Sequence, residues 1–257
     1  MLGVLLALPA GVALAQVGNW RLPFIILSIA SLLLAPLLAL LFPKLPAAKP
    51  AGLVGQLGLL RQPLFLAHLG LSVLLFSAMF SAYTYFGAWV EDALGLSPLG
   101  VALLLFLFGI AGLFGNGIAG RFADRAPIRA TVVAILILVA AVNLAALAGH
   151  SLLLAVVPLV VWSISHTASV TLGQIRVTLA GREAPPFAMT MNIAFANLGI
   201  AVGTLGGGRM IDAHGVGAIG LAPIGFVLVA LLLVIPIGRS AMRSTSGRIN
   251  NSASNLV

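Results

Sequence analysis

The chain has 257 residues, of which 61% are hydrophobic and 7% are charged, and its formal net charge is +8. A typical soluble domain is about 25% charged, so this composition excludes a soluble enzyme, a nucleic-acid-binding domain and a disordered chain. The sequence contains no cysteine, which excludes disulfides, thiolate metal sites and a cysteine nucleophile. A mean hydropathy of +1.19 instead predicts a protein whose solvent is lipid.

Segments without Asp, Glu, Lys or Arg divide the chain into stretches long enough to cross a membrane. One crossing needs about 20 apolar residues, and the longest segment, 130–175, contains a turn signal at Gly149-His150-Ser151. Because no alternating pattern of barrel strands occurs, we expect helices. The sequence predicts an all-α integral membrane protein, a polytopic bundle of eight transmembrane helices at 2–19, 22–42, 64–89, 98–119, 130–148, 152–175, 187–208 and 217–238.

The cationic residues between the spans predict how the chain is oriented in the membrane. Eleven of the 13 Lys and Arg residues fall in the alternate loops 44–61, 121–129 and 176–183 and in the C-terminal tail. The remaining loops hold only Arg21 and Arg209. Because cytoplasmic loops carry an excess of Lys and Arg, we expect both termini in the cytoplasm.

The two ends of the chain carry further signals. Residues 1–16 resemble a secretory signal, since an apolar run precedes Ala13-Leu14-Ala15. That run lacks a positively charged start, and Gly18 to Arg21 fit a short hairpin, so a first transmembrane span is favoured. The tail, 241–257, is rich in Ser and Asn and is expected to be disordered.

Four stretches, taken together, resemble spans of known transporters. Gly120 to Arg125 follows the small-residue segment Phe108 to Ala119, and it is similar to the Gly-x-x-x-Asp-Arg loop after the eighth span in the major facilitator superfamily. After Arg125 that family usually continues with Gly and two cations, whereas this chain has Ala126-Pro127-Ile128-Arg129. Pro9-Ala10-Gly11, together with Gln16 and Trp20-Arg21, resembles the fifth span of efflux permeases. Tyr83-Thr84-Tyr85 resembles the end of the seventh span. The segment from Asn192 through Gly207 resembles the eleventh span.

The resemblance implies that the chain corresponds to spans five to twelve of a twelve-span transporter and that the first four spans are missing. Its expected divisions are the last two spans of the N-terminal half-bundle (1–43), a cytoplasmic linker (44–61), the C-terminal six-helix half-bundle (62–240) and the cytoplasmic tail (241–257). In such transporters two six-span halves surround a site at the membrane midplane.

The function that the resemblance implies is secondary active transport by alternating access, in the inner membrane of a bacterial cell. The expected process is efflux of a small organic solute such as a drug, sugar or purine, with protons as the candidate coupling ion and with no cofactor, metal, nucleic acid or enzymatic activity. An alternative is a truncated membrane remnant that does not transport. A third class, an intramembrane hydrolase using Ser163 and His166, is disfavoured because no carboxylate lies in the span to orient the histidine.

The loop after the predicted span 98–119 is the first candidate for a functional element. Arg121, Arg125 and Arg129 follow one another at a spacing of four, which places them on one stripe if the turn is helical. With Gly120 and Asp124 they can form a charge cluster that latches one conformation and releases it. The alternative is a basic cytoplasmic loop that obeys the positive-inside rule.

His166 is the one ionisable side chain near the middle of a predicted span, and Ser163 shares its helical face. An intramembrane ionisable group is a functional candidate by default, so His166 is a candidate proton or substrate site. The alternative is a neutral imidazole that is hydrogen-bonded to a neighbouring helix. No Asp or Glu lies inside any predicted span, although a proton-driven antiporter normally needs a membrane carboxylate; this absence fits the missing first four spans and predicts a chain that does not couple transport to protons by itself.

Several further residues are candidates for a substrate cavity or for helix packing. Gln174, Asn192 and Asn197 are costly in lipid and should face a cavity or another helix. Tyr83 and Tyr85 fit either a cavity or an aromatic belt at the interface, and Trp89 is expected in that belt. A small-residue stripe with a spacing of four predicts close helix approach and includes Gly112, Gly199, Gly203 and Gly207.

Overall fold

The computed structural model describes residues 18–41, 52–123, 126–149 and 151–254, together with Gly11 and Leu14. At 53–54, 236 and 239–254 it describes only the backbone. Most of the predicted first span, residues 44–51 of the predicted linker, and Asp124 and Arg125 of the loop cluster therefore lie outside the described residues. Within the described part every regular element is a helix.

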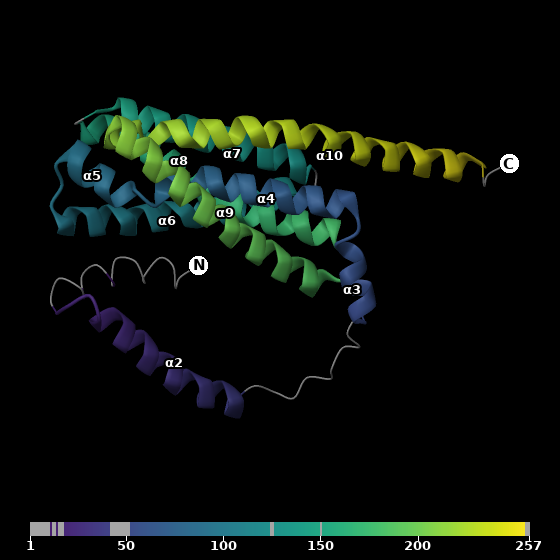
Figure 1. Cartoon of the computed structure of the whole chain (residues 1–257), viewed down its shortest axis with the longest axis horizontal. Coiled ribbons are helices and arrows are strands. Elements are labelled where there is room, and N and C mark those ends of the chain that lie inside the picture. The colour runs from purple at the N-terminus through teal and green to yellow at the C-terminus, as the bar shows by residue number, and fades with distance from the viewer. Residues whose placement is uncertain are drawn as a thin grey trace.

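The described chain is a succession of long helices joined by short turns (Figure 1). Seven of its segments are long and apolar enough to cross a membrane, so the predicted all-α membrane fold is confirmed. The elements are α2 (Leu22–Leu41), α3 (Leu53–Leu59), α4 (Pro63–Tyr83), α5 (Phe86–Leu94), α6 (Pro98–Ala123), α7 (Pro127–Leu147), α8 (Leu152–Ala180), α9 (Pro185–His214), the 3-10 turn η1 (Val216–Gly220) and α10 (Leu221–Ser254).

Several helix boundaries differ from those predicted. The predicted span 64–89 is broken at Thr84 and Tyr85 into α4 and α5, because the Tyr85 hydroxyl donates to the Thr204 carbonyl at 2.8 Å and holds the turn against α9. The helix predicted over 152–175 continues to Ala180. The tail was predicted to be disordered, but α10 continues as a helix through Ser254.

Proline and glycine mark the ends of the helices. α4, α7 and α9 each begin with a proline, which lacks the N–H group that a first helical residue leaves unpaired. Gly95, Gly149 and Gly215 follow the C-terminal ends of α5, α7 and α9. Their φ angles are positive, at 63°, 58° and 82°. Glycine adopts this conformation without the steric cost that a side chain brings, and so it closes the tight turns.

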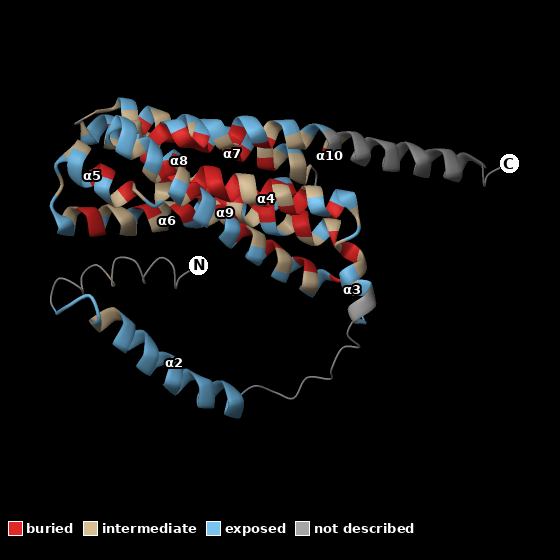
Figure 2. Cartoon of the chain, in the orientation of Figure 1, coloured by how far each residue is buried: buried red, intermediate tan, exposed pale blue. Residues whose placement is uncertain are grey.

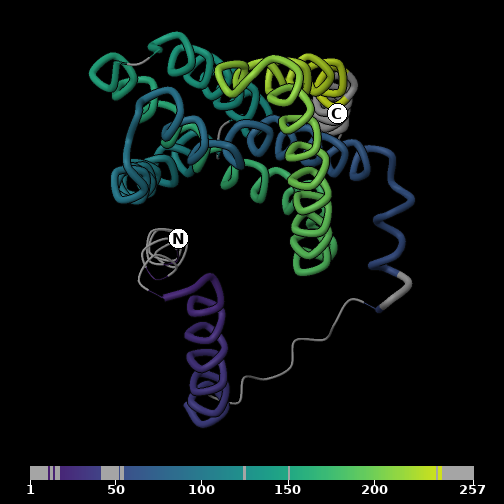
Figure 3. The backbone as a smooth tube through the Cα atoms, turned by 60° about the vertical axis from the view of Figure 1, so that its left-hand side comes forward, coloured from purple at the N-terminus to yellow at the C-terminus, as the bar shows by residue number. Residues whose placement is uncertain are grey.

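The six long helices from α4 to α10 form one bundle with its buried residues turned inward (Figure 2). α4 packs most extensively against α9 and α10, and α8 packs most extensively against α6 and α7. α2 lies apart from this bundle in Figures 1 and 3 and has no buried residue. A uniformly apolar helix of 20 residues is about 30 Å long, which matches the hydrocarbon core that would surround it.

The contact between α4 and α9 depends on three glycines of α9 spaced four residues apart. A Cβ atom added at Gly199, Gly203 or Gly207 would collide with backbone atoms of α4. The hydroxyl of Ser77 on α4 donates to the Gly199 carbonyl at 3.0 Å. Gly112 on α6 faces α8 in a similar way, since its added Cβ would collide with Thr167. The absent side chains let the two backbones approach closely.

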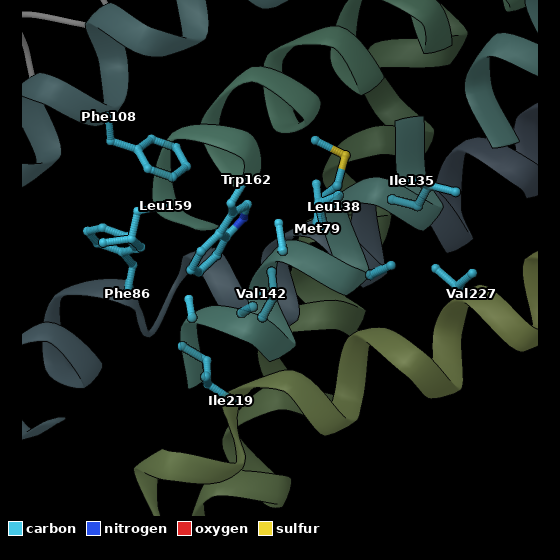
Figure 4. Close-up of a cluster of buried hydrophobic side chains, with 14 of the residues drawn as sticks. Met79, Phe86, Phe108, Ile135, Leu138, Val142, Leu159, Trp162, Ile219 and Val227 are labelled. Atoms are coloured by element: carbon cyan, nitrogen blue, oxygen red, sulfur yellow. The ribbon is translucent and has the colours of Figure 1, made fainter. Parts of the chain in front are cut away.

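The largest apolar cluster of the bundle joins residues from α4, α5, α6, α7, α8 and α10 (Figure 4). Phe86, Phe108 and Trp162 contact one another through their rings, with centroids 5.2–5.7 Å apart. Trp89 is completely buried and belongs to this cluster. The predicted place of Trp89 in an interfacial belt is therefore wrong, because the break before α5 turns this short helix into the bundle.

We expect Gly203→Ala to lower the thermal unfolding midpoint of the detergent-solubilised protein, because its methyl group would collide with the backbone of Ser77. Overpacking of this kind costs about 1–3 kcal/mol. Gly117→Ala is the matched control, since Gly117 lies in the helical, exposed part of α6 with open space around its Cβ position. There alanine should leave the midpoint unchanged or raise it. Equal effects of the two substitutions would contradict the packing described here.

Candidate functional site

Arg176 is the most deeply buried cation that the structure describes, with 1% of its surface exposed. The sequence pattern predicted a loop position for it, but α8 continues for four residues beyond Arg176 to Ala180, with Gly181 as its C-cap. That prediction is wrong because counting charges between apolar segments cannot distinguish a loop cation from one in the last turns of a helix. Gly181 and Pro185 were the signals that place the helix end later.

The Arg176 guanidinium joins three helices through hydrogen bonds to neutral groups. One terminal nitrogen lies 2.8 Å from the His68 carbonyl and 2.9 Å from His68 Nδ1, and the other donates to the Ser72 hydroxyl at 2.8 Å. Ser72 in turn donates to the Asn192 side-chain oxygen at 2.8 Å. Arg176, His68, Ser72 and Asn192, from α8, α4 and α9, are called the arginine network below.

The geometry of the arginine network determines the tautomer of His68. A guanidinium group has only donors, so His68 Nδ1 accepts and the ring proton resides on Nε2. This contact requires a neutral imidazole, since a protonated one would place two positive charges side by side. Arg176 Nε has no hydrogen-bond partner in the described structure, so the network leaves one nitrogen of a buried cation unpaired.

His166 lies earlier on α8 than Arg176, in a different environment in which aromatic rings surround it. Its ring centroid is 4.7 Å from that of Tyr83, 5.5 Å from Phe80 and 6.2 Å from Phe108. The side chain is buried, and its Nδ1 has no hydrogen-bond partner among the described atoms. Ser163 does not pair with it, because the Ser163 hydroxyl donates to the Phe108 carbonyl.

Two stripes of polar side chains reach open faces of the bundle. On α8, Thr167, Thr171, Gln174 and Thr178 are spaced three or four residues apart; Gln174 is exposed, whereas the partly buried Thr171 hydroxyl donates to the Asn116 side-chain oxygen of α6 at 2.6 Å. On α9, Thr190, Asn197 and Thr204 are spaced seven apart, and Asn197 is exposed and bonded only to its own helix, at the Ile193 carbonyl. We call these two sets the polar stripes. Polar groups at membrane depth are expected to face water or another polar surface.

The structure thus separates residues that the sequence had grouped together. Asn192 belongs to the buried arginine network, whereas Asn197 and Gln174 lie on open faces. Tyr83 packs against His166, and Tyr85 secures the turn before α5. Of the loop cluster, Gly120 and Arg121 lie in the last turn of α6 and Arg129 lies in the first turn of α7, and all three are exposed. His68 and Ser72 were not predicted, since both lie near the start of an otherwise apolar span.

The sequence matches the Major Facilitator Superfamily over residues 1–182 and again over residues 71–254. The chain belongs to the Major Facilitator Superfamily. This is a family of membrane transporters, and the chain is accordingly a multi-pass membrane protein.

Individual relatives agree with this assignment. The chain is 28% identical over 235 residues to a probable sugar efflux transporter of Pasteurella multocida, covering 91% of this chain and 58% of that protein. It is 31% identical over 230 residues to the inner membrane transport protein YdhP of Escherichia coli K12, covering 88% and 58%. The chain therefore spans somewhat over half the length of these curated relatives.

A solved structure shares the fold. A bacterial homologue of the human lysosomal transporter Spinster, in an inward-facing and unoccupied conformation, has a TM-score of 0.63 and 17% identity to this chain. The similarity covers 94% of this chain and 68% of that one. At this level of identity the comparison establishes the arrangement of helices.

We expect Asn192→Leu to lower the thermal unfolding midpoint, because it leaves the buried Ser72 hydroxyl without the acceptor at 2.8 Å. Loss of a buried partner costs about 1–3 kcal/mol. Asn197→Leu, on the same helix, is the control and should have little effect on the midpoint, since its side chain is exposed. A larger loss of stability for Asn197→Leu than for Asn192→Leu would contradict the described network.

Proposed function

We propose that the chain acts in secondary active transport and exports a small organic solute, with sugars as the first class to test. Family membership supports the transporter class, and sugar efflux is the function in the names of two relatives at 28% and 29% identity. The observation that carries the proposal is the pair of polar stripes. Hydroxyl and amide groups on an otherwise apolar bundle are suited to exchanging hydrogen bonds with a polyhydroxylated solute.

In the proposed mechanism the six-helix bundle moves as one unit around a solute site. The arginine network ties α4, α8 and α9 together and would keep the polar stripes in register during this movement. The division into 1–43, 44–61, 62–240 and 241–257 remains part of the proposal, as does the latch formed by Gly120, Arg121, Asp124, Arg125 and Arg129. Two-state contacts of this kind are what alternating access requires.

The proposed location is the inner membrane of a bacterial cell, with the basic loops in the cytoplasm. YdhP, one of the relatives, is named an inner membrane protein. With Arg176 assigned to the bundle, ten cations instead of eleven remain on the side that holds the termini, against Arg21 and Arg209 on the other side. The asymmetry still favours cytoplasmic termini.

We propose that His166 supplies the proton site if transport is coupled to protons. We expect His166→Phe to keep the thermal unfolding midpoint, because phenylalanine fits among the surrounding rings and removes a buried nitrogen that has no described partner. The same variant should lose the dependence of efflux on an imposed pH gradient. His68→Phe is the matched control and should lower the midpoint by breaking the arginine network. A destabilised His166→Phe variant, or one with normal gradient dependence, would contradict the assignment.

A chain that inserts without transporting is the second candidate. The relatives from which the proposed function is taken are longer than this chain, which covers 58% of their length. The two candidates differ in a single result, which is whether membranes containing the chain move a solute faster than membranes without it.

The test is efflux of radiolabelled sugars from cells that express the full chain, with expression and insertion measured in parallel. We expect faster efflux than from cells without the chain. Asn197→Leu should slow efflux about fivefold, as loss of one hydrogen bond to the solute would, at unchanged abundance. Leu205→Met replaces an exposed apolar residue of the same helix and should leave the rate unchanged. Normal insertion with no efflux of any solute would support the second candidate, a chain that inserts without transporting.

A further inference from the structure

A long apolar groove runs between α6 and α7, and its floor is α8. Its volume is about 530 Å³, which is within the range of about 300–1,000 Å³ for small-molecule sites. The groove exists because small residues line its depth, where larger side chains would fill the space: Ala119, Ala130, Ala134 and Ala168. Among these, Ala119, Ala134 and Ala168 are buried, so the groove reaches into the bundle.

The groove is separate from the candidate transport site. Ile164, Ala168 and Leu172 of α8 line it, whereas the His166 ring packs on Tyr83 and the Arg176 guanidinium bonds to His68, both on α4. Its outer edges are exposed apolar side chains, with Phe122 at 59% and Val133 at 54% exposure. Since all three helices are membrane spans, the medium that meets this opening is the lipid bilayer.

A cation lies at one end of the groove. Arg129, Val133 and Ile137 line it at a spacing of four residues on α7, so they form one stripe about 12 Å long. Arg129 is in the first turn of a helix of 21 residues, which is long enough to cross the hydrocarbon core. This position places Arg129 at the depth of the headgroups and Ile137 near the middle of one leaflet.

The charge around the mouth is positive. Arg121 lies in the last turn of α6 and Arg129 in the first turn of α7. The first turn of α7 has no side-chain hydrogen bond from its cap residue, Ala126, and the N-terminal end of a helix favours negative charge. The groove thus combines an apolar channel along the leaflet with positive charge at the headgroup level.

We propose that the groove binds one acyl chain of an anionic phospholipid and that Arg129 pairs with the phosphate of its headgroup. The acyl chain occupies the space above Ala134 and Ala168, where it replaces packing that the small side chains do not supply. An anionic headgroup is preferred over a zwitterionic one because its net charge complements Arg129 and Arg121. Lipid binding in this groove does not require that the chain transports a solute, so its test is independent of the proposed function.

The test is a lipid titration of the full chain in detergent, followed by native mass spectrometry. The probes are phosphatidylglycerol and phosphatidylcholine with identical acyl chains. We expect the wild-type chain to retain one phosphatidylglycerol with about fivefold higher affinity than phosphatidylcholine, the factor expected for one cation near an anionic headgroup. Arg129→Gln should remove this preference, and Arg209→Gln, which changes an exposed arginine of α9, should retain it.

A second pair of variants tests the groove itself. Val133→Trp places a large ring in the groove and should weaken binding of both lipids. Leu136→Trp is the matched control, because Leu136 is exposed on α7 but does not line the groove. Both variants should keep the wild-type thermal unfolding midpoint without added lipid. Equal affinity for the two lipids would overturn the headgroup assignment, and equal binding by Val133→Trp and Leu136→Trp would overturn the groove as the site.

Discussion

Lipid offers no hydrogen bonds, so every polar group of this chain at membrane depth must find a partner in the protein or in a water-filled path. Several described contacts meet this constraint, although His166 Nδ1 and Arg176 Nε are buried without a described partner. The Ser77 hydroxyl donates to the Gly199 carbonyl, the Tyr85 hydroxyl donates to the Thr204 carbonyl, and the Asn143 amide donates to the Gly220 carbonyl. Each bond joins two elements, so polar groups that are costly in lipid also fix how the helices pack.

Arg176 is the most demanding case of this constraint. A buried guanidinium is costly unless its donors are satisfied, and here two of its nitrogens are satisfied by neutral groups of His68 and Ser72. The arrangement holds α4, α8 and α9 together at one end of the bundle, while the glycines of α9 hold α4 along its length. The polar stripes differ from this network, because Gln174 and Asn197 in them are exposed. A bundle with a fixed interior and open polar faces is suited to moving as one unit around a solute.

The sequence predicted the helices well where one physical signal dominates. Long apolar runs bounded by Pro and Gly predicted most spans, and the spacing of Gly199, Gly203 and Gly207 predicted a close helix contact. It did not predict features that depend on distant residues. The break at Tyr85 depends on Thr204, which is 119 residues away, and the buried position of Arg176 depends on His68, 108 residues away. Trp89 was misplaced for the same reason, since only the turn before α5 directs it inward.

The central claim is that the polar stripes face a water-filled path, and thiol labelling tests it most directly. The sequence contains no cysteine, so single cysteines can be introduced without background. Asn197→Cys and Gln174→Cys, in membranes containing the full chain, should react with a water-soluble, membrane-impermeant thiol reagent. Leu232→Cys, at a position of α10 that is 69% exposed and apolar, should react slowly because lipid covers it. Equally slow reaction at all three positions would contradict the account, since the polar stripes would then lie in lipid or against protein.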